Sequence, residues 1–280
     1  MNSRSSRSSW YERVPKVELH LHLEGAIPVE ALWQLVQKYG VPEDVPNLAA
    51  LQKKFVYRDF PHFIKTWVWK NQFLREYEDF SFIAEAVARD LAAQNIRYVE
   101  AFFSPGDFAR FGLTPDRLAV AIRAGLRRVQ DTEISLVADL IRDFGPSIGA
   151  HVLQRVNDVR DEAGIIGIGI GGSEQSHPPE PWRDVYEQAR SLGLRTSCHA
   201  GEAAGPESVW GAISTLRADR IGHATRAVED PALVEHLDQG IQDCDLGCAE
   251  LRGCTVEDAA TQPRAKGARR FSFWNLVLND

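Results

Sequence analysis

The chain has 280 residues, of which 44% are hydrophobic and 25% are charged, an ordinary composition for a soluble globular protein. This length allows one large domain or two small ones. The net charge of −7 argues against non-specific nucleic-acid binding, which needs a basic surface. No apolar run approaches the roughly 20 residues that cross a membrane, and four cysteines do not indicate a disulfide scaffold. We therefore expect a cytoplasmic protein that binds neither nucleic acid nor membrane.

Three parts of the chain differ in character. Residues 1–14 begin with a serine- and arginine-rich stretch that lacks the apolar core of a secretory signal, so we expect a flexible leader. Residues 15–240 carry regular strand and helix patterns and predict the folded domain. Over residues 241–280 neither pattern is clear, and we interpret this segment as an atypical tail.

The stretch 17–25 predicts the first strand, because three leucines alternate there with Glu18, His20, His22 and Glu24. Successive side chains of a strand point to opposite faces, so we expect the leucines on one face and the polar residues on the other. Two histidines separated by one residue lie about 6–7 Å apart at Cα. Their imidazoles can therefore converge on one metal ion.

Helices and then a regular alternation follow this strand. Apolar residues recur with helical spacing from Pro28 to Tyr39, and the aromatic-rich stretch 50–93 is predicted to be mostly helical. The strand-like segments that come next are 96–103, 134–140, 165–170, 194–199 and 219–223. The helix-like segments among them are 115–130, 147–163, 181–192, 206–217 and 230–238. This order predicts βαβ units and a parallel sheet of six strands, whereas a closed (β/α)₈ barrel has eight.

Two further polar clusters stand at the ends of predicted strands. One strand ends at His199, with Glu202 shortly after it, and the next strand ends at His223. In parallel barrels the catalytic groups come from the carboxyl ends of the strands. We therefore expect these residues to share one site with the two histidines of the first strand.

These residue types favour a zinc site that activates water. Zinc binds imidazole and carboxylate ligands, and His20, His22 and His199 form the natural set of three nitrogens. A catalytic zinc keeps one position open for water and lowers the pKa of that water to about 7. His223 would take the proton of the water, and Glu202 would carry it to a nitrogen of the substrate.

Three segments together carry a resemblance to a known family. They are Pro15–Ala26 with its His-Leu-His-Leu-Glu-Gly core, His199–Glu202 (His-Ala-Gly-Glu), and Arg220–Thr225 (Arg-Ile-Gly-His-Ala-Thr). In order and spacing, residues 15–240 resemble the adenosine deaminase family of zinc aminohydrolases. The resemblance implies a metal-dependent hydrolase with a TIM-type (β/α)₈ barrel. It also implies that the aromatic helical insertion after the first strand forms part of a lid.

The resemblance implies a role for each catalytic residue. His20, His22 and His199 would be the ligands of one zinc ion per chain. Glu202 would donate a proton to N1 of a purine, and His223 would orient the attacking hydroxide.

The resemblance also implies a small-molecule purine nucleoside as the substrate, with contacts at His22, Glu24 and Gly172. Glu24 stands where the family has an acidic residue that contacts the sugar. Gly172 matches a glycine whose backbone N–H contacts the purine. Hydroxide would add to C6 and ammonia would leave. Adenosine is the expected substrate, and free adenine and 6-aminodeoxyfutalosine, which other members use, remain open.

The tail at residues 241–280 departs from the family pattern. The last zinc ligand of the family is an aspartate in a Thr-Asp-Asp-Pro-like motif, and no Asp-Asp pair occurs in this chain. A Cys-Pro-x-Ser-Asn type strand is also missing, so strands seven and eight are unaccounted for. We expect an incomplete barrel, with a tail that resembles out-of-frame or divergent sequence.

Two other functions remain open at this point. A catalytically impaired relic of the family would keep the histidines and lose turnover for lack of the aspartates. A two-metal amidase that shares only the His-x-His strand would need a bridging lysine or carboxylate on a middle strand, and residues 168–172 offer none.

Overall fold

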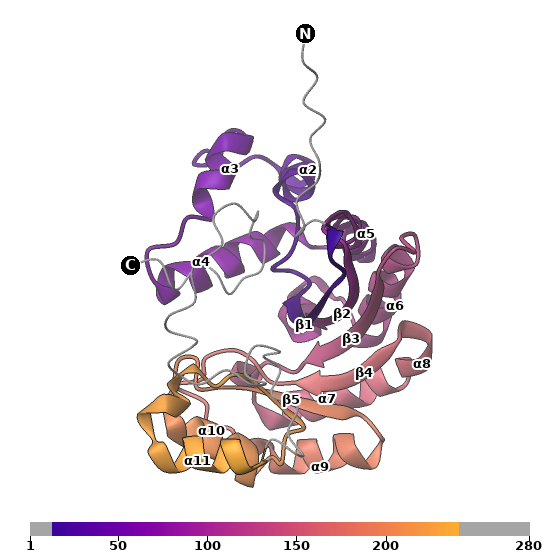
Figure 1. The fold of residues 1–280 in the computed structure, drawn as a ribbon. Coiled ribbons are helices and arrows are strands. Elements are labelled where there is room, and N and C mark those ends of the chain that lie inside the picture. The colour runs from indigo at the N-terminus through magenta and orange to yellow at the C-terminus, as the bar shows by residue number, and fades with distance from the viewer. Residues whose placement is uncertain (1–12, 241–280) are drawn as a thin grey trace.

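The computed structural model describes residues 13–240, which contain a six-stranded parallel sheet (Figure 1). The strands are β1 (Lys16–His22), β2 (Ile96–Phe103), β3 (Glu133–Asp139), β4 (Ile165–Gly169), β5 (Arg195–Ala200) and β6 (Arg220–His223). Each strand pairs in parallel with the next one in the chain, so all their carboxyl ends lie at the same end of the sheet. The sheet curves into most of a barrel (Figure 1). The incomplete TIM-type barrel predicted from the sequence is thus confirmed.

Helices connect the strands and cover the outer face of the sheet (Figure 1). The insertion between β1 and β2 contains α2 (Val29–Tyr39), α3 (Leu48–Lys54), α4 (Phe60–Lys70) and α5 (Tyr77–Ala93). The later helices are α6 (Pro115–Leu126), α7 (Gly145–Asn157), α8 (Arg160–Ala163), α9 (Arg183–Ser191), α10 (Pro206–Ser214) and α11 (Pro231–Gly240). The predicted helical insertion is confirmed, and no helix in this part of the chain has the length and apolarity to cross a bilayer.

One predicted helix is divided in the structure. Residues 147–163 form α7 and α8, because the chain leaves helical geometry at Val159, with φ −119° and ψ 12°. The second helix then ends at Gly164, whose φ of +68° lies in the left-handed region that glycine favours. This break carries Ala163 into the core, where it is fully buried.

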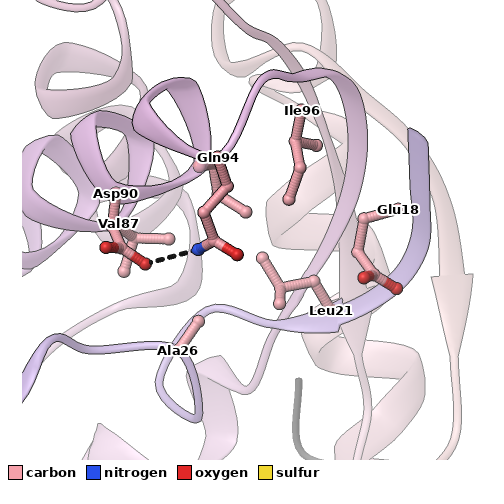
Figure 2. Close-up of a pocket in the computed structure, with 8 residues that line it drawn as sticks. Glu18, Leu21, Ala26, Val87, Asp90, Gln94 and Ile96 are labelled. Atoms are coloured by element: carbon pink, nitrogen blue, oxygen red, sulfur yellow. Dashed lines mark hydrogen bonds between the residues drawn. The ribbon is translucent and has the colours of Figure 1, made fainter. Parts of the chain in front are cut away.

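The perfect alternation expected for the first strand is wrong, because β1 contains a bulge. Glu18 pairs with Val99 and Leu21 with Ala101, so β1 has one residue more than β2 over this interval. Leu19 therefore faces the barrel interior, whereas Glu18 lies beside Leu21 in a small pocket next to α5 (Figure 2). The bulge separates the leucines onto two faces and lets His20 point into the barrel.

The core lies between the sheet and the helices that cover it. Ala101 and Phe103 of β2 belong to this core and are fully buried. Phe102, between them, faces the opposite way and lines the barrel interior together with Leu19 and Val137. Because β2 is buried on both faces, it reads as a nearly continuous apolar run.

Candidate metal centre

Three imidazoles from two strands meet at the carboxyl end of the barrel. His20 and His22 end β1, and His199 lies near the end of β5. The Nε2 atom of His199 is 2.9 Å from the Nε2 atoms of both His20 and His22, which are 3.3 Å from each other. Two ligand nitrogens of a tetrahedral zinc ion lie about 3.3 Å apart. Both the donor atoms and their spacing therefore fit zinc.

Neighbouring groups hold these rings in orientation. The Phe102 ring stacks on His20 and His22, with centroid distances of 4.6 and 5.3 Å. The Nδ1 atom of His199 is 3.1 Å from the carbonyl oxygen of Ile170. Because a carbonyl only accepts hydrogen bonds, Nδ1 carries the proton and Nε2 keeps the lone pair that a metal ion needs.

Burial keeps the three imidazoles neutral. It lowers the pKa of His20 and His199 well below the usual range, and it lowers the pKa of His22 to about 4. The charge of Lys70 further lowers the pKa of His22. Since a neutral imidazole is the form that binds metal, these residues have no proton to release at neutral pH before zinc binds.

Glu202 and His223 lie together beside these rings. Glu202 follows β5 and His223 ends β6, and Oε2 of Glu202 is 3.3 Å from Nε2 of His223. Burial and then the charge of Glu174 raise the pKa of Glu202 to about 7, whereas burial lowers the pKa of His223 well below its usual range. A carboxyl group that holds a proton near neutral pH can act as a general acid.

The backbone that carries His223 is strained. His223 and Ala224 both have positive φ angles, +76° and +49°, which cost a non-glycine residue about 1 kcal/mol or more. The N–H of Ala224 donates to the carbonyl oxygen of Ala200 at 2.9 Å, and the hydroxyl of Thr225 donates to that of Gly201 at 2.7 Å. These bonds hold the turn that directs His223 toward Glu202.

Two glycines leave room for the rings of the site. A Cβ atom on Gly222 of β6 would lie 2.5 Å from Cε1 of His20. A Cβ atom on Gly169 of β4 would lie 2.7 Å from Cε1 of Phe102, the ring on which two imidazoles stack. Any side chain at either position would displace the cluster.

The predicted substrate residue Glu24 is enclosed by the protein. Its side chain has no exposed surface, and Oε1 accepts the backbone N–H of Ser104 at 2.9 Å. The ammonium group of Lys70 donates to the carbonyl oxygen of Glu24 at 2.5 Å. Burial, the largest effect, raises the pKa of Glu24.

Gly172, the other predicted substrate contact, follows β4 at the same end of the barrel as the imidazoles. Its φ is +102°, and an added Cβ would lie 2.1 Å from Oδ2 of Asp143. Only glycine fits there. Its predicted contact with the purine stays a prediction.

The sequence reasoning missed a buried arginine that joins the strand ends. Arg142 follows β3 and is 1% exposed, and its guanidinium donates to the carbonyl oxygens of His177 at 2.7 Å and His199 at 2.6 Å. Phe102, the stacking platform, was also missed. Neither residue has a sequence pattern that separates it from ordinary arginines and core phenylalanines.

The structure thus brings most of the predicted site residues together at the carboxyl end of the barrel. The clustered side chains are those of His20, His22, His199, Glu202 and His223. Their individual roles and the domain boundaries at residues 15 and 240 stay predictions. The tail from residue 241, with its expected lack of strands seven and eight, lies outside the described residues.

A parallel barrel with imidazoles gathered at its carboxyl end has metal-binding groups where enzymes of this fold carry their active sites. Comparison with known proteins gives the family. The sequence pattern of the family "Adenosine deaminase" matches residues 15–252. A protein of Albidiferax ferrireducens named adenine deaminase is 31% identical over 248 residues, which are 85% of this chain and 70% of that protein. The chain therefore belongs to the adenosine deaminase family, and it is a hydrolase of the purine-deaminating kind.

Two solved structures agree with this assignment. The crystal structure of adenine deaminase from Arthrobacter aurescens has a TM-score of 0.71 and 26% identity, and covers 80% of this chain and 68% of that one. A Burkholderia ambifaria amidohydrolase solved with bound zinc has a TM-score of 0.73 and 27% identity, with coverages of 85% and 68%. The zinc of that second protein is consistent with the fit of the three imidazoles to this metal.

Proposed function

We propose that this protein deaminates adenine, releasing ammonia and the 6-oxopurine, with one zinc ion held by His20, His22 and His199. The observation that carries the proposal is the convergence of three neutral imidazole nitrogens within 3.3 Å of one another. Glu202 beside them supplies the acid that purine deamination needs. The adenine deaminases among the relatives support adenine as the substrate.

In this mechanism the protein residues place and move protons. Zinc, when bound, supplies the Lewis acidity that makes water a nucleophile at neutral pH. His223 orients that water and accepts its proton. Glu202, protonated near neutral pH, gives a proton to N1, so that C6 becomes electrophilic and the ring does not develop a full negative charge. Water adds to C6, the proton held by His223 then moves to the 6-amino nitrogen, and this group leaves as ammonia. The C6 hydroxyl returns its proton to Glu202 as it becomes the 6-oxo group, so both residues regain their starting forms.

The predicted sugar contact of Glu24 belongs to the adenosine alternative. The Glu24 side chain is fully enclosed, and its Oε1 atom accepts the Ser104 N–H, while its Oε2 atom has no hydrogen-bond partner among the described residues. Localisation in the cytoplasm stays a prediction as well.

A catalytically impaired relic is the second candidate, and one sequence observation favours it. The 280 residues contain no Asp-Asp pair, whereas the family pattern ends its zinc ligand set with such an aspartate. Three imidazoles can bind zinc without a carboxylate, as they do in other zinc enzymes. The two candidates therefore differ in turnover more than in metal binding.

The decisive experiment measures zinc and turnover on the same sample. Purified protein is loaded with zinc, its zinc content is measured, and ammonia release is followed with adenine, adenosine and 6-aminodeoxyfutalosine in parallel. We expect about one zinc per chain and the highest kcat/KM with adenine. A preference for adenosine would refute the proposed substrate. Zinc binding without ammonia release from any of the three purines would establish the relic.

A further inference from the structure

A buried carboxylate that lies outside the predicted catalytic set contacts the loop that carries Glu202. Glu174 comes after β4 and is 3% exposed. Its Oε1 atom accepts the backbone N–H of Gly201 at 2.6 Å. Its Oε2 atom accepts those of Glu202, Ala203 and Ala204 at 3.1, 2.6 and 3.0 Å. Four consecutive backbone donors thus surround one carboxylate.

Consecutive N–H groups that converge in this way form a nest, a backbone concavity that binds anions. The chain enters the nest through Gly201, whose φ is +74° and whose added Cβ would lie 2.8 Å from Cγ2 of Val209. Hydrogen bonds to a charged acceptor are about twice as strong as neutral ones. The loop therefore cannot rotate without breaking several strong bonds at once.

The segment that carries Glu174 is itself held by residues that follow β3. The backbone N–H and the hydroxyl of Ser173 both donate to the Asp143 carboxylate, at 2.7 and 2.5 Å. The Arg142 guanidinium donates to the carbonyl oxygen of His177 at 2.7 Å. Bonds on both sides of Glu174 thus fix its segment to the end of β3, and Glu174 extends this connection to the end of β5.

We propose that Glu174 is a positioning residue for the proton donor Glu202, a role that rests on the proposed deamination. The nest fixes the backbone of residues 201–204, and this places the Glu202 carboxyl 3.3 Å from the His223 ring. A displacement of about 1 Å in a catalytic group costs on the order of 100-fold in rate. The negative charge of Glu174 also favours the protonated form of Glu202, which is the form that donates.

Glu174→Gln tests this role without changing the size of the side chain. An amide keeps one accepting oxygen and turns an NH₂ group against the remaining backbone N–H donors. We expect kcat with adenine to fall about 100-fold, while KM and zinc content change less than about 3-fold. The decline of kcat toward alkaline pH should also move to lower pH, because Glu202 loses a neighbouring negative charge. Glu174→Asp keeps the charge and should retain the pH profile with part of the rate.

Asp219→Asn is the matched control. Asp219 precedes β6, and its Oδ2 atom accepts the backbone N–H of Thr196 at 2.8 Å, at the amino end of the strands whose carboxyl ends carry the site. Both substitutions remove a carboxylate that accepts backbone N–H groups, Asp219 at the amino end of β5 and Glu174 just beyond its carboxyl end. We expect Asp219→Asn to lower the free energy of unfolding and to leave kcat and its pH profile unchanged.

Wild-type kcat with an unshifted pH profile in Glu174→Gln would overturn the proposal, and so would an equal loss of kcat in Asp219→Asn. Amide hydrogen exchange of residues 201–204 in the zinc-loaded proteins tests the anchoring by Glu174 independently of the proposed deamination. Slow exchange in the wild type that becomes fast in Glu174→Gln supports the anchoring even if no purine is deaminated. Exchange that is fast in both proteins, or slow in both, contradicts it.

Discussion

Gly222→Ala should lower the affinity for zinc while the metal-free protein still folds, because it adds one methyl group directly against a predicted ligand. Gly222 lies on β6, outside the left-handed region, so its backbone accepts alanine. The new Cβ would lie 2.5 Å from Cε1 and 3.0 Å from Nδ1 of His20. The imidazole or the strand must therefore move.

The size of the movement follows from ordinary contact distances. Carbon atoms pack at about 3.5–4.0 Å, so the His20 ring must retreat by about 1 Å. Phe102 stacks on this ring at a centroid distance of 4.6 Å, and His199 and His223 lie at 4.6 and 5.4 Å, so little free space remains around it. Ligand distances in zinc sites vary by only about 0.2 Å. We expect His20 to be lost as a ligand and zinc affinity to fall by at least about 100-fold, because even outer-shell changes cost 10–100-fold.

Zinc affinity is measured by competition with a chromophoric chelator, and folding by urea unfolding of the metal-free proteins. Gly106→Ala is the control, since its Cβ would lie 3.1 Å from the Phe144 ring, which is 42% exposed and free to turn away. Wild-type zinc affinity in Gly222→Ala would refute the reasoning. It would mean that His20 is no ligand, or that the site tolerates a displacement of an ångström.

Three further predictions concern the ends of β5 and β6. Glu202→Gln should abolish ammonia release and leave zinc content unchanged. In the wild type, kcat should fall above about pH 7, because Glu202 has a pKa of about 7 and must be protonated to donate; constant activity to pH 9 would exclude it as the acid. Ala224→Gly should raise the free energy of unfolding, measured in urea, by about 0.5 kcal/mol. Glycine relieves about 1–2 kcal/mol of backbone strain at a φ of +49°. This gain exceeds the roughly 0.4–1 kcal/mol by which the greater conformational entropy of glycine stabilises the unfolded chain. A loss of stability in that variant would show that the turn is unstrained.

The sequence predicts the barrel well because its signals are local. Each βαβ unit repeats the same change from an apolar run to a helical period, and all six strands fall within three residues of their predicted ranges. The histidines at strand ends could be assigned to one site because parallel strands place their carboxyl ends together. These inferences need no knowledge of which side chains touch.

The features that escaped prediction depend on contacts between distant segments. The bulge in β1 arises from its pairing with β2, and the residues of β1 alone show only perfect alternation. Arg142 bonds a backbone carbonyl of β5, and Glu174 bonds backbone N–H groups of the loop that follows β5. Backbone groups are the same in every residue type, so the sequence does not reveal these contacts. The same holds for Gly222, which is small because a ring from β1 lies against it.

Zinc removal gives a last prediction, because the three ligands join strands at the two sides of the barrel. His20 and His22 belong to β1 and His199 to β5, and the described strands place β2, β3 and β4 between them. A metal ion bound only by the folded chain stabilises it by about 2.7 kcal/mol at a free concentration 100 times Kd. We expect chelation to lower the melting temperature and zinc to restore it, with no such response in His22→Asn. An unchanged melting temperature on chelation of a protein that demonstrably held zinc would mean that the ion does not bridge these strands.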